Sequence, residues 1–214
     1  MKKNLFFVLV LVVSGLSFAQ GGYKPYNQFS IETGLGYSMP MSGKSFDNSG
    51  SYSSFTNLEL GARYMFNQNF GAKFNMLYNS FRESSEGVNH TRFMVSGFYN
   101  VGNLFDLTFK TYEAVALYMH AGVGMGYVKS TDSEIKGTDR QPTYAFGISP
   151  RFRITEKISI MTDVSYYGIV KQHMYYNGQR IEPFTTEGQN ASHIAITVGL
   201  VFNLGNKRYH ADWY

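Results

Sequence analysis

The stretch FSIETGLGY, residues 29–37, decides the fold because its apolar side chains alternate with polar residues and glycines. Successive side chains of a β-strand point to opposite faces, so this stretch predicts a strand with one apolar face. Seven further runs repeat the alternation, and together the eight runs occupy residues 29–37, 57–66, 70–78, 93–101, 115–127, 144–154, 158–166 and 193–204. The chain is therefore predicted to be all-β.

The lengths of the runs and of their connections favour a membrane barrel over a soluble sandwich. A tilted strand needs about ten residues to cross a bilayer, whereas soluble strands typically span about five or six. Outer-membrane barrels alternate long external loops with short periplasmic turns. That rhythm is expected here, with long polar connections at 39–53, 82–91, 129–142 and 171–191 and tight ones at 67–69 and 155–157. We predict a closed, eight-stranded, antiparallel, up-and-down transmembrane β-barrel with both ends in the periplasm.

One connection breaks this rhythm. Residues 102–112 should form a short periplasmic turn but are as long as an external loop. Their Leu-Phe-Asp-Leu-Thr-Phe stretch itself alternates, so an extension of one strand is one interpretation, and the sequence leaves the role of this connection open.

The N-terminus has the features of a secretory signal peptide. Lys2 and Lys3 precede the apolar run Leu5 to Val13, and Ser17-Phe18-Ala19 gives a small-residue cleavage site. We expect a signal peptide at 1–19, the barrel at 20–205 and a periplasmic tail at 206–214. The chain contains no cysteine, so neither a lipid-anchoring cysteine nor a disulfide is available to it.

Composition also bears on the surroundings of the barrel. Charged residues make up 16% of the chain, below the ~25% usual for soluble globular proteins. The faces opposite the apolar ones mix Gly, Ala, Ser and isolated charges, which suits a barrel interior. The formal net charge of +4 includes two signal-peptide lysines and shows no clustering, so nucleic acid is not an expected partner. Outer-membrane lipid and lipopolysaccharide are the expected surroundings.

Charged residues on the polar faces are expected to gather inside the barrel. An eight-stranded barrel is only wide enough to be filled by side chains, so opposite charges there should pair into a plug. The alternative is a gate in a narrow, porin-like passive channel. The predicted luminal charge network consists of Glu32, Glu59, Arg63, Lys73, His120, Arg151, Arg153 and Asp163.

Enzymatic chemistry and metal binding find little support in the sequence. Ser192 and His193 are adjacent on a strand and point to opposite faces, so they cannot form a nucleophile and base pair with each other. A Ser, His and carboxylate group from several strands stays open, as in lipid A-modifying or phospholipid-cleaving barrels. The five histidines lack metal-ligand spacing. We expect no catalytic residues, no metal and no cofactor.

The last long loop is the candidate recognition surface. It mixes aromatic and basic residues of the kind that anchor interfaces, while external loops are also often merely variable and polar. The candidate binding residues are His173, Tyr175, Tyr176, Arg180 and Phe184.

Three features of the chain together resemble the OmpA/OmpX-like outer-membrane barrel family of Gram-negative bacteria: the signal segment, the eight-strand pattern and YNVGNLFD at residues 99–106. The resemblance implies an outer-membrane barrel that anchors, stabilises the envelope or mediates adhesion. VFNL at 201–204 resembles the aromatic-ended signal read by the barrel-assembly machinery, and HADWY at 210–214 resembles the linker to a peptidoglycan-binding domain. That domain is not in the sequence, so cell-wall anchoring is not carried over.

The tail is expected to dock on the lower rim of the barrel or on a periplasmic partner, with Trp213 and Tyr214 as interfacial anchors. The predicted function is a non-enzymatic structural, accessory or adhesion role, with an envelope complex or an extracellular protein as partner. A narrow channel and, after it, a lipid-modifying enzyme are the alternatives. The sequence leaves the oligomeric state open.

Overall fold

Long antiparallel strands form most of the molecule. The structure is a computed structural model that describes residues 25–181 and 188–213; the predicted signal segment 1–19 lies outside these residues. The strands are β1 (Phe29–Ser42), β2 (Ser54–Met65), β3 (Phe70–Glu83), β4 (Glu86–Asn100), β5 (Val115–Ser130), β6 (Asp139–Arg153), β7 (Ile158–Gln172) and β8 (Gln189–Leu204).

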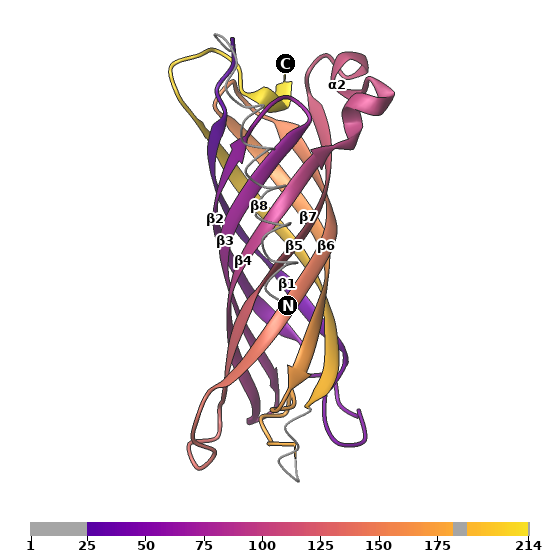
Figure 1. Ribbon diagram of the computed structural model, residues 1–214, viewed down its shortest axis with the longest axis vertical. Helices are drawn as coiled ribbons and strands as arrows, with labels where there is room; N and C mark the ends of the chain where they lie inside the picture. Colours follow the sequence, from indigo (N-terminus) through magenta and orange to yellow (C-terminus); the bar gives the residue numbers. More distant parts are fainter. Residues whose placement is uncertain (1–24, 182–187, 214) are drawn as a thin grey trace, which may run out of the picture.

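The strands close into a barrel (Figure 1). Each pairs antiparallel with its neighbours in chain order, and β1 pairs with β8 from Phe29 opposite Leu204 to Ser42 opposite Ser192. Closure gives both edge strands a hydrogen-bonding partner, which a sheet in lipid requires. The predicted eight-stranded up-and-down barrel is confirmed.

The barrel is apolar outside and polar inside. On β1, Ile31 and Leu35 are exposed, with Leu35 at 68%, whereas Ser30 and Glu32 on the opposite face are fully buried. The other strands repeat this arrangement, with exposed Leu, Ile, Val and Phe on the outer face and Ser, Asn, Arg and His among the buried residues. A soluble domain would place these faces the other way round, so the exterior suits lipid.

The two ends of the barrel differ in their connections. The tail end, at the top of Figure 1, carries the turns 66–69 and 154–157, the β4–β5 connection and residues 205–213. The loop end, at the bottom, carries the connections 43–53 and 131–138 and the loop between β7 and β8. By the usual asymmetry of such barrels, the tail end is expected to face the periplasm.

The prediction of a long loop at residues 82–91 is wrong. β3 runs to Glu83 and β4 starts at Glu86, so only two residues turn the chain, with Ser84 in the left-handed region at φ 57°. On β4, Asn89 and Thr91 lie on the outer face, to either side of fully buried His90. The outward face is polar there, and the inward face mixes apolar Phe81 and Val88 with His90, so the sequence does not show the usual alternation.

The connection after β4 does not prolong a strand. It forms a 3₁₀ turn, η1 (Val101–Phe105), followed by the short helix α2 (Leu107–Lys110). Asp106 joins the two in the left-handed region at φ 52°, and the Lys110 amide donates to the Asp106 carbonyl at 2.8 Å. Among the described residues, no helix is long and apolar enough to cross a membrane.

A charge on the outer face should destabilise the barrel. Val123 lies near the middle of β5, is 67% exposed and pairs with Val95 and Tyr144. We expect Val123→Arg to lower the free energy of unfolding by about 2–4 kcal/mol, because a guanidinium would enter hydrocarbon. Urea unfolding from lipid vesicles measures the change. The control is Phe46→Arg, at a side chain that is 90% exposed in the β1–β2 loop. Equal stability of both variants would contradict an outer face in lipid.

Candidate functional site

A cluster of buried charges crosses the lumen at the tail end. Three basic side chains form ion pairs with Glu32 of β1: Arg63 Nε, Arg151 Nη2 and Lys73 Nζ each lie 2.7 Å from one of its carboxylate oxygens. Lys73 Nζ also lies 2.6 Å from Glu59 Oε1. These five side chains come from β1, β2, β3 and β6 and are buried. Strand parity brings them together, since each lies on the inward face of its strand.

The C-terminal tail supplies a sixth member of this cluster, Asp212, which the strand pattern does not reveal. Arg63 donates to both of its carboxylate oxygens, at 2.8 and 2.6 Å, in a bidentate pair. Tyr118 Oη donates at 2.7 Å, and Arg151 Nη1 lies 3.5 Å away. We call Glu32, Glu59, Arg63, Lys73, Arg151 and Asp212 the tail-end charge cluster; its three cations and three carboxylates balance.

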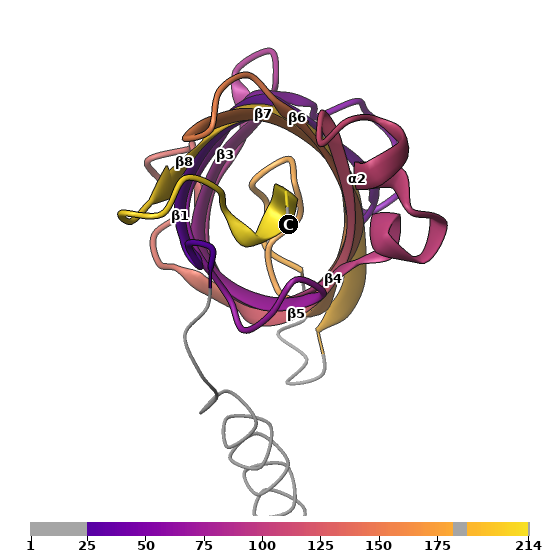
Figure 2. The same cartoon turned by 90° about the horizontal axis from the view of Figure 1, so that it is seen from above.

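The tail reaches this position by folding back into the mouth of the barrel. Figure 2 shows the segment before the C-terminus inside the ring of strands. The Asn27 amide donates to the Tyr209 carbonyl at 2.8 Å and the Ala211 amide to the Asn27 carbonyl at 2.9 Å. The 3₁₀ turn η2 (Ala211–Trp213) then packs Trp213, 2% exposed, in one buried cluster with Phe98.

The tail thus docks on the barrel, but Trp213 lies inside its mouth and not at an interface on the lower rim. Its indole is buried in the lumen, because the ion pairs of the adjacent Asp212 hold this part of the tail inside. Tyr214 lies outside the described residues.

Asp212 is ionised in this setting. Burial alone would raise the pKa of its carboxyl, but Arg63, His210 and Arg151 more than offset burial and hold the pKa well below its usual range. His210 Nδ1 lies 3.1 Å from Asp212 Oδ1 and is itself buried.

His120 and Asp163 form a separate pair further along the lumen. His120 Nε2 lies 2.8 Å from Asp163 Oδ2 and 3.4 Å from Ser165 Oγ. A hydrolase triad requires the carboxylate on one ring nitrogen and the serine on the other. Here both contact the same nitrogen, so His120 is not oriented as a base for Ser165. A cavity of about 10 Å³ beside these residues and Glu59 has room for about one water molecule.

Arg153 does not join the tail-end charge cluster. It lies at the rim, where its Nη1 donates to Glu113 Oε2 at 2.7 Å, and its guanidinium lies 5.9 Å from the Trp213 ring. The last inward position of a strand opens onto the rim, so Arg153 fastens the β4–β5 connection and the tail to the barrel.

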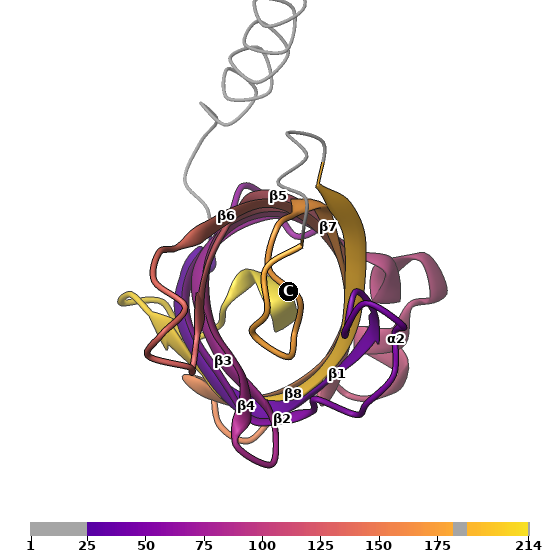
Figure 3. The same cartoon turned by 90° about the horizontal axis from the view of Figure 1, so that it is seen from below.

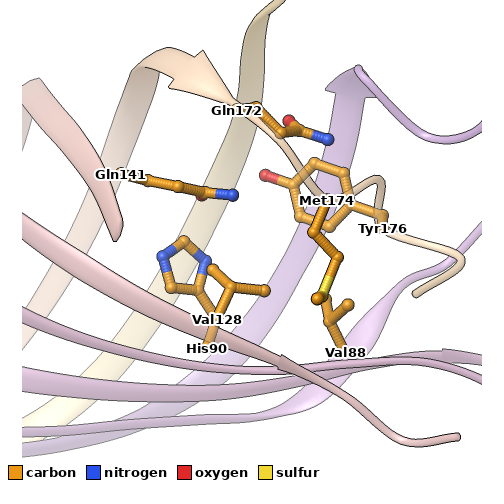
Figure 4. A pocket seen from close by; sticks show the side chains of 7 residues that line it. All are labelled: Val88, His90, Val128, Gln141, Gln172, Met174 and Tyr176. Carbon is orange, nitrogen blue, oxygen red and sulfur yellow. The ribbon is translucent and has the colours of Figure 1, made fainter. Parts of the chain in front are cut away.

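The loop after β7 closes the other end of the barrel. Figure 3 shows this segment inside the ring when the barrel is seen from the loop end. Tyr176 Oη lies 2.8 Å from His193 Nδ1, and Phe81 packs edge-on against the Tyr176 ring at 4.7 Å. Burial raises the pKa of Tyr176, so its hydroxyl stays protonated. In Figure 4, Met174 and Tyr176 lie with His90, Gln141 and Gln172 around a small space inside the barrel.

Arg92 lies beneath this loop and is absent from the predicted charge network. It is fully buried, its guanidinium carbon lies 4.2 Å from the Tyr167 ring centre, and it donates to Asn79 Oδ1 at 2.5 Å. Within residues 25–181 and 188–213, no carboxylate lies within ion-pair distance of it. The hydrogen bond to Asn79 and the cation–π contact with Tyr167 are the interactions that stabilise its charge.

The candidate loop-binding residues do not form one exposed surface. Tyr175 and Tyr176 are buried at 4% and 3% exposure, because the loop folds inward rather than outward. His173 is half-buried, with Nδ1 lying 3.2 Å from Asp139 Oδ1, and Arg180 donates to the Lys136 carbonyl. Phe184 lies outside the described residues.

Comparison with known proteins agrees with this architecture. Residues 6–202 match the family model described as outer membrane protein beta-barrel domain. The chain belongs to this family. Members of the outer-membrane barrel family reside in the outer membrane of Gram-negative bacteria, which is therefore the location of this protein. No curated protein sequence matches the chain.

Solved structures of outer-membrane barrels share the fold. Neisserial surface protein A superposes with a TM-score of 0.60 at 13% identity, covering 86% of this chain and 100% of that one. A major outer membrane protein from Thermus thermophilus gives 0.50 at 10% identity, covering 83% and 98%. The attachment invasion locus protein of Yersinia pestis gives 0.46 at 17% identity, covering 83% and 99%. At such identities the likeness to the first two shows the fold alone.

The described lumen offers no metal centre. Within residues 25–181 and 188–213, no group of three or more His, Asp or Glu side chains is arranged to hold a metal ion. The luminal carboxylates instead lie against arginine, lysine and histidine.

Removing the Asp212 charge should release the tail. The chain has one tryptophan, so the emission of Trp213 reports docking. We expect Asp212→Asn to shift that emission to the red and to lower the free energy of unfolding by about 3–5 kcal/mol, because a buried cation loses its partner. Glu113→Gln, the same kind of change in the half-exposed pair with Arg153, should leave both nearly unchanged. Identical behaviour of the two variants would count against the charge cluster.

Docking of the wild-type tail should weaken in acid. The pKa of Asp212 is lower in the docked state than in a free tail, so its contribution is complete above about pH 5 and is lost as pH falls below about 4. Trp213 emission measured between pH 7 and about pH 2 checks this, with Asp212→Asn as the flat reference. Release of the tail when the pH is raised toward neutrality would contradict the assignment.

Proposed function

We propose that the protein is a non-enzymatic outer-membrane barrel with a closed lumen, which acts as a structural or recognition element through its external surface. The observation that carries the proposal is the tail-end charge cluster, whose charges balance only when Asp212 is docked. A neutral cluster of buried charges blocks a pore, so a channel would not benefit from it. In a barrel that serves as a rigid anchor, the same cluster holds the strands and the tail in one arrangement. The inward-folded loop around Tyr176 supports the same proposal at the other end.

An external groove supports the recognition half of the proposal. It lies between the β1–β2, β5–β6 and β7–β8 loops and has a volume of about 730 Å³. Its lining combines Phe46, 90% exposed, and Ile135 with charged side chains. Exposed aromatic residues beside charged ones are typical of protein interfaces. The full lining is Phe46, Glu134, Ile135, Lys136, Tyr175, Gln179 and Arg180.

The alternatives are a narrow passive channel and a lipid-modifying enzyme. A cavity no larger than about one water beside His120 disfavours conduction, and the contacts of Ser165 disfavour nucleophilic catalysis. A mass change in lipid A or phospholipid that depends on Ser165 would favour the enzyme.

Single-channel recording in planar bilayers tests the closed lumen. We expect the purified wild type to show no discrete openings, because side chains, the tail and the fourth loop fill the barrel. A variant lacking residues 206–214, and carrying a short turn in place of residues 173–188, is the control and should conduct. Steady openings of the wild type would favour the channel.

Photo-crosslinking in native cells tests the groove. A benzophenone side chain at position 46 should give a protein adduct, and Lys136→Glu in the same chain should reduce its yield several-fold. The matched control is the same probe at Ser85, which is exposed in the β3–β4 turn but does not line the groove. Equal adducts from both positions would contradict specific recognition.

A further inference from the structure

The β4–β5 connection exposes four large apolar or aromatic side chains at the periplasmic rim. Leu104 and Phe105 of η1 are 64% and 65% exposed, Phe109 of α2 is 84% exposed and Tyr112 after it is 90% exposed. The same segment buries Gly102 and Thr108 against the barrel. The connection also exposes Asp106 and Lys110, so its exposed surface combines these four large side chains with one acidic and one basic group.

The connection lies on the outside of the barrel and not over its mouth. Figure 2 places α2 outside the ring of strands, and Figure 1 shows it at the tail end of the barrel. It rejoins the barrel at β5, where the Arg153 amide donates to the Ala114 carbonyl at 2.9 Å. The neighbouring outward residues of the lipid-facing surface are Phe152, 43% exposed, and Ile154, 55% exposed. The exposed side chains of the connection therefore continue the lipid-facing surface.

The backbone of the connection is held in an unfavourable shape. Tyr112 and Glu113 both adopt left-handed conformations, at φ 52° and 60°, which cost free energy for residues other than glycine. Arg153 stabilises this shape, with Nη1 donating to Glu113 Oε2 at 2.7 Å and Nη2 to the Tyr112 carbonyl at 3.4 Å. The other two periplasmic turns manage with a few residues, so the long connection is more than a link between strands.

We propose that residues 104–112 form a membrane-interface anchor that lies in the periplasmic leaflet, at the boundary between phospholipid headgroups and acyl chains. Leu104, Phe105 and Phe109 enter the acyl region, while the hydroxyl of Tyr112 stays with the headgroups, as aromatic residues do at membrane interfaces. Lys110, exposed at the end of α2, is placed to meet lipid phosphate. Continuity with the lipid-facing strands favours lipid over a protein partner as the occupant.

Spin labelling tests this placement directly, because the chain has no cysteine and each label is unique. We would label Phe109→Cys and Phe105→Cys in the full barrel, refolded into phospholipid nanodiscs, and compare collisions with oxygen, which partitions into lipid, and with a water-soluble nickel chelate. Phe146→Cys on the outer face of β6 is the lipid reference, and Phe46→Cys in the first external loop is the water reference. Heat-modifiable migration on gels confirms that each variant has closed its barrel.

We expect labels at 105 and 109 to collide more often with oxygen than with nickel, at a ratio between those of 146 and 46. Moving the label to Asn103, a half-buried neighbour on the barrel side, should lower the ratio. Ratios at 105 and 109 equal to that of Phe46→Cys would place the connection in water and overturn the proposal. Such ratios combined with label immobilisation only in native membranes would also overturn it and would point to a periplasmic protein instead.

Discussion

The carboxylate of Glu32 is the point on which the interior of the barrel depends. Three cations from three different strands converge on it, each at 2.7 Å, in a space with almost no exposure to water. Charges cannot leave bulk water without partners, so every member of the cluster constrains the others. Glu59 and Asp212 complete the balance, and the tail must therefore occupy the lumen. The packing of Trp213 and the closure of the barrel mouth at the tail end follow from this electrostatic requirement.

Alternation makes the barrel and its luminal charges predictable. Glu32, Arg63 and Lys73 lie at inward positions of strands whose parity is clear from the sequence. Asp212 escapes prediction because the tail has no periodicity from which to infer direction. One signal is present: the predicted network holds four basic residues, Arg63, Lys73, Arg151 and Arg153, against three carboxylates, Glu32, Glu59 and Asp163. Arg92, buried without a carboxylate partner among the described residues, shows that such an excess does not by itself demand another one. The hairpin tip at residues 84–91 resembles a loop because its outward residues, such as Asn89 and Thr91, are polar, and its inward residues pair apolar Val88 with His90.

The aromatic residues of the β7–β8 loop show where composition misleads a prediction from sequence. Tyr175 and Tyr176 have the composition of a recognition surface, yet they are buried in the barrel mouth. Composition reports that a side chain can bury apolar area; it does not report whether a partner or the chain itself provides the site. The groove beside Phe46 and Lys136 is likewise out of reach of the sequence, because it is formed by loops distant along the chain. The outer surface available for recognition thus depends on how the loops share the space above a filled lumen.

The position of Asp212 also ties the tail to the closure of the barrel. The tail follows β8, and the pairing of β8 with β1 is what closes the barrel. Arg63 and Arg151 belong to β2 and β6, on opposite sides of the ring of strands, and both contact Asp212. The complete set of contacts around Asp212 therefore requires a closed barrel, and a misregistered β1–β8 seam would leave the tail without some of them.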